Sequence, residues 1–135
     1  MDFVVNFIPV IIIAVLFMPV GAFVYSSKGF GNMWLDAIGK TEEEIKNEDN
    51  NMAVYMGGAF VSSLLTVYLL ALLIENIGVA SIGALFIVVI IVYFIVLLIR
   101  LKSTFFDGNF KLFQVNLIGT FLEFIVAFVV FALFL

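Results

Sequence analysis

The amino-acid sequence predicts an all-α membrane protein, an antiparallel bundle of four transmembrane helices. The chain has 135 residues and is 65% hydrophobic and 12% charged, whereas a soluble domain is about half apolar and about a quarter charged. Charged residues divide it into four apolar stretches, each long enough to cross ~30 Å of hydrocarbon as a helix of about 20 residues. The stretches are continuous rather than alternating, which excludes a transmembrane β-barrel. An isolated strand is excluded as well, because lipid would leave its backbone polar groups unpaired.

The four helices are expected over about 3–25, 53–75, 79–100 and 113–134, in a single domain that covers residues 1–135. The first stretch follows Met1 and Asp2 with no basic segment before it, and it is too long for the apolar part of a cleaved signal peptide. We therefore expect it to remain as a membrane helix. Pro9 and Pro19 lie inside it, where a proline either kinks the helix or is simply tolerated.

The segment 26–52 is the one long connection between the expected helices. Within it, residues 32–38 predict a short interfacial turn that ends at Gly39, with Trp34 as an anchor among the lipid headgroups. Thr41 and Glu44 have the spacing of a capping box. A short acidic helix is therefore expected after Thr41, with its charges facing water.

The positions of the basic residues predict the orientation of the chain. All six lie in or beside the connections after the first and third helices: Lys28, Lys40, Lys46, Arg100, Lys102 and Lys111. Basic residues are retained on the cytoplasmic side of a membrane. We therefore expect a multi-pass protein of the cell (inner or plasma) membrane, with loops 26–52 and 101–112 in the cytoplasm and both termini outside.

Small and polar residues mark the contacts between helices in lipid, and two of the expected helices carry a stripe of them. In the second helix the stripe recurs every four residues, at Gly58, Ser62 and Thr66. In the last helix it follows one helical face, at Asn116, Thr120, Glu123 and Ala127. The simplest arrangement packs these two stripes against each other.

Glu123 is the most informative residue of the chain. It lies about eleven residues, or ~16 Å, into the last expected helix, near the middle of the membrane, where a charge costs at least ~2.5 kcal/mol. No Lys or Arg is expected at that depth. Glu123 is therefore expected either to carry a proton at neutral pH, as desolvation favours, or to face a wet cavity. Glu123, Thr120 and Asn116 form a candidate site for a proton, a cation or a substrate; the alternative is a neutral carboxyl group that only holds helices together.

The composition excludes several kinds of chemistry. With neither cysteine nor histidine in the sequence, there are no disulfides, no thiol nucleophiles, no Cys/His zinc sites and no histidine acid–base catalysis. No pair of carboxylates lies at depth in the expected helices, so we expect no enzyme, no bound metal and no cofactor. The net charge is −4 and the basic residues are scattered, which argues against nucleic-acid binding. The expected partners are the lipid bilayer and a second copy of the chain.

Two segments of the chain carry a recognisable pattern. The first reads GAFVYSSKGFGNMWLDAIGKTEEE, with Gly21, Tyr25, Gly31, Trp34, Gly39 and Thr41 at the relevant positions. The second reads STFFDGNFKLFQVNLIG, with Phe106, Asp107, Gly108, Asn116 and Gly119. At these positions the chain resembles a family of small bacterial and archaeal membrane proteins known as domain of unknown function 1761. The resemblance covers nearly the whole chain and implies the same four-helix layout, but it brings no established activity.

The chain departs from the family pattern at two places. Val24 stands where the family usually has Trp, and the last helix lacks the His that relatives often carry near its start. If that His does chemistry in relatives, this chain either lacks the chemistry or uses Glu123 in its place.

Two functions are consistent with these features. One is a small oligomeric transporter or channel with an acidic site in the membrane, in which a homodimer supplies the path that four helices barely enclose. The other is a non-catalytic scaffold or partner subunit, in which Glu123 holds helices together.

Overall fold

The computed structural model describes residues 5–24, 26, 28–41, 43–44, 51–104 and 108–135, without the side chains of 51–56. Its helices are α1 (Phe7–Val24), α2 (Gly31–Ile38), α4 (Asn51–Ile77), α5 (Ile82–Thr104) and α6 (Phe110–Leu133). None of the described residues is in a strand. Four of the helices, α1, α4, α5 and α6, are long and apolar enough to cross a membrane. The predicted all-α class with four transmembrane helices is therefore confirmed.

The helix ends differ from the predicted ones by a few residues, and one difference matters. The third predicted span ended at 100, whereas α5 continues to Thr104. The Thr104 and Ser103 hydroxyls donate to the Arg100 carbonyl oxygen, at 2.5 and 3.2 Å, and help to close this last turn. Arg100, predicted as the last residue of this span, therefore lies one turn before the end of the helix.

Helix α1 starts with a hydrogen bond to the Asn6 side chain and contains two prolines. The Asn6 side chain accepts a hydrogen bond from the Ile8 amide at 3.1 Å, which satisfies one of the amides that a helix start leaves free. Pro9 lies in the first turn of α1, where its missing N–H costs nothing. The helix also continues through Pro19, so both prolines are accommodated within one uninterrupted span.

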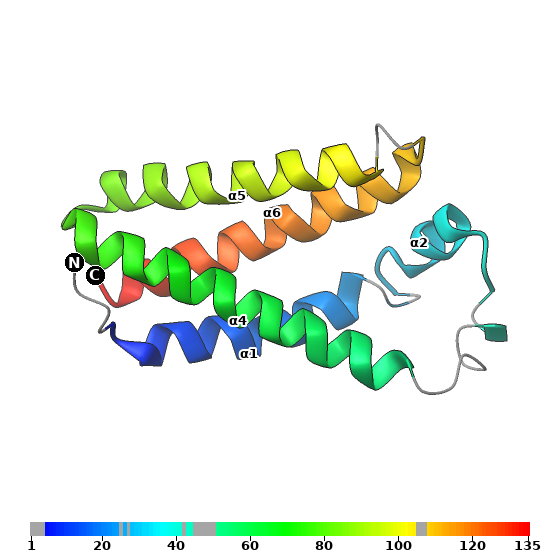
Figure 1. Ribbon diagram of the computed structural model, residues 1–135, viewed down its shortest axis with the longest axis horizontal. Coiled ribbons are helices and arrows are strands. Elements are labelled where there is room, and N and C mark those ends of the chain that lie inside the picture. The colour runs from blue at the N-terminus through cyan, green and yellow to red at the C-terminus, as the bar shows by residue number, and fades with distance from the viewer. Residues whose placement is uncertain (1–4, 25, 27, 42, 45–50, 105–107) are drawn as a thin grey trace.

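The four long helices lie alongside one another (Figure 1). The start of α1, the turn from α4 to α5 and the end of α6 lie at one end of the bundle, which we call the termini end; α2 and the turn from α5 to α6 lie at the other, the loop end (Figure 1). Helix α6 packs most extensively against α5 and then against α1 and α2, and α4 packs mainly against α1.

The predicted contact between the stripes of α4 and α6 is wrong. The two helices make little contact, and Gly58 and Ser62 are exposed. A Cβ atom built at Gly58 meets no atom within 4 Å, so no neighbouring helix approaches there. The Thr66 hydroxyl instead donates to the Ser62 carbonyl oxygen of its own helix at 2.9 Å, as threonine in membrane helices commonly does.

The main cluster of buried side chains is almost entirely apolar, with Tyr93 as its one polar member. All four long helices contribute to it, with Ile13, Val67, Leu70, Leu85, Val89 and Ala127 among its most buried members. Phe86 packs edge-on against Phe124 and Phe128, with ring centroids 5.8 and 5.6 Å apart. Large apolar side chains also cover the outside of the long helices, which is unfavourable in water but suits lipid.

Helix α2 closes the loop end. It ends at Gly39, whose φ of 70° is left-handed, a conformation that glycine adopts without strain. The segment predicted as a short turn over 32–38 is thus a helix of two turns with the expected stop. Asn109 donates to the Ala37 carbonyl oxygen at 2.9 Å, and Lys111 pairs with Asp36, so α2 is fixed against the start of α6.

The acidic segment after α2 is described only in part. Thr41 accepts a hydrogen bond from the Glu44 amide at 3.2 Å, which is the first half of the predicted capping box. Residue 42 and residues 45–50 lie outside the described part of the chain.

Candidate functional site

The carboxylate of Glu123 has a cationic partner inside the membrane. Arg100 of α5 places its Nη2 atom 3.7 Å from Oε2 of Glu123 in α6. The expectation that no Lys or Arg lies at this depth is therefore wrong. The reason is geometric: helical side chains lean toward the helix N-terminus, so the long Arg100 side chain extends from the last turn of α5 back toward the middle of the membrane.

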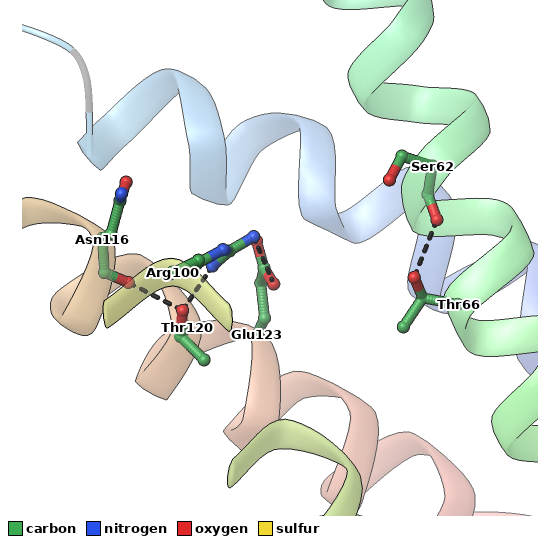
Figure 2. Close-up of polar contacts among 6 residues, drawn as sticks. All are labelled: Ser62, Thr66, Arg100, Asn116, Thr120 and Glu123. Carbon is green, nitrogen blue, oxygen red and sulfur yellow. Dashed lines mark hydrogen bonds and ion pairs between the residues drawn. The ribbon is translucent and has the colours of Figure 1, made fainter. Parts of the chain in front are cut away.

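A chain of polar contacts links Arg100 to two further residues of α6 (Figure 2). The guanidinium donates to the Thr120 hydroxyl oxygen. That hydroxyl in turn donates to the Asn116 backbone carbonyl oxygen at 2.7 Å. Arg100 thus joins α5 to α6 at two levels, through Thr120 and through Glu123. Ser62 and Thr66 of α4 lie apart from this cluster (Figure 2).

The ion pair itself is loosely held. Its 3.7 Å separation is well beyond the ~2.7–2.9 Å of a charge-assisted hydrogen bond. The two side chains remain 33% and 24% exposed for Arg100 and Glu123, so neither is sealed in the core. Within the described part of the chain, the one hydrogen bond of the guanidinium is to Thr120. Since a guanidinium has five N–H donors, the contacts with Thr120 and Glu123 leave donors for a further partner.

Beside the pair lies a cavity of about 90 Å³ between α1, α5 and α6. Its walls combine three polar side chains with small and aliphatic residues: Arg100, Asn116, Glu123, Val20, Gly21, Val24 and Gly119. A Cβ atom built at Gly21 or Gly119 meets nothing within 4 Å. These two glycines are therefore not needed for close helix packing; they leave the cavity open. The space is large enough to hold water.

The structure brings together the residues that the sequence singled out on α6. Glu123 and Asn116 line the cavity, and Thr120 is buried next to them with 4% exposure. Three of the family-signature positions, Gly21, Asn116 and Gly119, line the cavity, as does Val24 at the position of the departure from Trp.

The other signature positions lie at the loop end, away from the cavity lining. They include Gly31, Trp34, Gly39 and Thr41 in and after α2, and Gly108 before α6. Gly39 and Gly108 have φ values of 70° and 92°, so both serve turns that favour glycine. Tyr25, Phe106 and Asp107 lie outside the described residues.

Sequence reasoning missed two residues of this region, Arg100 and Tyr93. Tyr93 is 3% exposed, and its hydroxyl has no hydrogen-bond partner among the described residues. Its ring packs edge-on against Phe124, the neighbour of Glu123, with centroids 6.4 Å apart. Tyr93 precedes Arg100 by two helical turns, which places both on one face of α5. That seven-residue spacing is the signal that could have found them together.

No group of three or more acidic side chains that could hold a metal ion is found in the part of the chain that the structure describes. The charges of the cavity are one guanidinium and one carboxylate. Such a site can hold water or a small polar solute by hydrogen bonds and charge, without a prosthetic group.

Four apolar helices that could each cross a membrane, three of them surrounding a cavity lined by charged side chains, define a multi-pass membrane protein. A family model described as protein of unknown function (DUF1761) matches residues 8–135, and the chain belongs to this family. No curated protein and no solved structure matches the chain significantly.

Proposed function

We propose that this protein is a small membrane transporter and that the cavity between α1, α5 and α6 is its substrate site. One observation carries the proposal: the Arg100–Glu123 pair faces an open polar cavity inside the membrane-spanning part of the chain. Charged residues there are costly and commonly mark substrate or ion pathways. A pair that only fastened two helices would not require an open polar cavity beside it.

In this proposal each polar residue of the cavity binds a different chemical group of the solute. Glu123 attracts a cationic group or a proton, Arg100 attracts an anionic group, and the Asn116 amide both donates and accepts hydrogen bonds. Thr120 holds the guanidinium in position. No residue is assigned a catalytic role.

The proposal includes an orientation with loops 26–52 and 101–112 in the cytoplasm. Its support is that Lys28, Lys40, Lys102 and Lys111 all lie between the end of α1 and the start of α4 or around the connection from α5 to α6. Figure 1 shows α2 and the turn from α5 to α6 at one end of the bundle, opposite the end of α6. Reporter fusions that are active only in the cytoplasm should work at Lys46 and fail after Leu135. The reverse pattern would overturn the orientation.

Transport is tested with purified protein in liposomes that contain a pH-sensitive dye, against a panel of ions and small polar solutes. The parent protein should carry flux above protein-free liposomes, and Glu123→Gln should lower that flux at least tenfold. Glu75→Gln is the matched control, because Glu75 is an exposed carboxylate in the last turn of α4, far from the cavity. No flux for any solute, or equal flux from Glu123→Gln and the parent, would contradict the proposal.

A second candidate function is a non-catalytic scaffold or partner subunit. It is favoured by the double contact of Arg100 with Thr120 and Glu123, which fastens α5 to α6. In that case substitutions of Arg100 and Glu123 change the free energy of unfolding, while liposomes with the parent protein show no flux. The two measurements on the same variants therefore separate the candidates.

A further inference from the structure

We infer that the cavity takes a small zwitterionic solute, one that carries both a carboxylate and an ammonium group. This inference deepens the proposed transport function and rests on it. The cavity contains one positive and one negative side chain, Arg100 and Glu123, so its formal charge is zero. A free cation is attracted by the carboxylate and repelled by the guanidinium nearby, and a free anion meets the opposite pair of forces. A zwitterion aligned against the pair gains from both charges.

The looseness of the pair lets a solute enter between its charges. At 3.7 Å the two groups attract each other without the short hydrogen bonds that would lock them together. The planar guanidinium can bind a carboxylate through two parallel N–H bonds, and one of its five donors is used by Thr120. The Glu123 carboxylate can then accept from an ammonium group. Both charges remain paired when the solute is bound, so its entry exposes no lone charge to the membrane.

The cavity is small, with a volume of about 90 Å³, so it suits a small solute. Gly21 and Gly119 leave the space open, and larger side chains at either position would occupy it. The smallest amino acids fit this description, and Asn116 on the cavity wall offers a donor and an acceptor for the polar groups that the ion pair does not reach.

The test measures the thermal unfolding midpoint of detergent-purified protein with glycine or β-alanine. Acetate and methylammonium, alone and mixed, serve as the two separate halves of the solute. The zwitterions should raise the midpoint in a saturable way, because ligand binding to the folded state stabilises it. Neither half and no mixture of the halves should do so at the same concentration. An equal shift with acetate or methylammonium, or no shift with either zwitterion, would overturn the inference.

A variant separates binding in the cavity from general stabilisation by solutes. Gly21→Leu places a side chain where a Cβ atom meets no neighbour, so the fold should survive while the shift with glycine disappears. Gly57→Leu is the control, because Gly57 is an exposed glycine of α4 with equally open surroundings, and it should keep the shift. A shift that persists in Gly21→Leu would show that the solute binds elsewhere.

The failure of this inference differs from a failure of the transport proposal. Liposomes that carry flux of another solute, together with protein that does not bind glycine or β-alanine, would contradict the inference alone. Protein that binds glycine in the cavity but moves no solute across liposomes would contradict transport and leave the zwitterion site standing.

Discussion

Helices α4 and α6 carry similar stripes of small and polar residues, yet the two stripes have opposite surroundings. On α6, Thr120 is 4% exposed and Ala127 is fully buried, and Glu123 faces the cavity. On α4, Gly58 and Ser62 are exposed on the outside of the bundle. Spacing and composition alone therefore do not decide which polar stripe becomes a contact between helices.

The difference lies in what each stripe can satisfy by itself. Thr66 and Thr120 both donate to a carbonyl oxygen four residues earlier, at 2.9 and 2.7 Å. Neither hydroxyl needs a second helix for its proton. Glu123, however, carries a group that its own helix leaves uncompensated, and it finds Arg100 on α5. In this protein the buried stripe is the one that contains a charge.

The largest expected effect comes from removing that charge's partner. Arg100→Leu should lower the free energy of unfolding by about 2 kcal/mol, because it leaves the Glu123 carboxylate unpaired; fully buried pairs lose ~3–5 kcal/mol, and this pair is partly exposed. Unfolding in mixed detergent is the measurement. Lys102→Leu, which removes an exposed cation of the same helix, should change little. An equal loss in both variants would show that the charge does not set α6 apart.

The two threonines sharpen the comparison with matched variants. Thr120→Val removes the acceptor of the Arg100 guanidinium and should cost about 1 kcal/mol of unfolding free energy. Thr66→Val removes only a bond within α4 and should leave stability within ~0.5 kcal/mol of the parent. Both variants are compared in the same detergent. If Thr66→Val lowered the unfolding free energy more than Thr120→Val, the α4 stripe, and not the α6 stripe, would be the one that contacts another helix.

Tyr93 tests whether the region around Glu123 tolerates an unsatisfied polar group. Tyr93→Phe removes a buried hydroxyl that has no partner among the described residues. Since burying such a group costs ~1–3 kcal/mol, the variant should be as stable as the parent or up to about 1 kcal/mol more stable. A clear loss of stability in thermal unfolding would show that the hydroxyl binds a water or another group in the membrane.

The smallest effect is expected on the exposed face of α4. Ser62→Leu should leave the unfolding free energy of a single chain within ~0.5 kcal/mol of the parent, because Ser62 faces outward and lipid solvates an added apolar side chain well. Size-exclusion chromatography in detergent then measures whether the variant changes the oligomeric state. If the homodimer expected from the sequence forms through this face, Ser62→Leu should shift the protein toward the monomer, because close helix contacts need small residues.

The sequence was sufficient for the class of fold and for one half of the candidate site. Long apolar runs have one stable form in lipid, which is why the four helices were predictable. The face that holds Asn116, Thr120 and Glu123 followed from their spacing. The partner of Glu123 did not, because it depends on a helix end that lies at Thr104 rather than at 100 and on the direction in which a long side chain leans.

The contact partners of the helices were not predictable for a related reason. A stripe of small residues can face a neighbouring helix, a second chain or lipid. The Thr66 hydroxyl needs none of these as a partner, because it donates to the Ser62 carbonyl oxygen of its own helix. The open space at Gly21 and Gly119 also depends on where α1 meets α6, which no residue pattern within one helix specifies.

Arg100 and Glu123 belong to consecutive helices, because α5 ends at Thr104 and α6 begins at Phe110. During biosynthesis each charge on its own would oppose the entry of its helix into the bilayer; the cost is ~2.5–3.5 kcal/mol on insertion scales for a charge at a helix centre, and it is smaller for Arg100, which lies near a helix end. If α5 and α6 enter together as a hairpin, the guanidinium and the carboxylate meet before either faces the acyl chains alone. The ion pair therefore favours the entry of α5 and α6 into the membrane as a single hairpin.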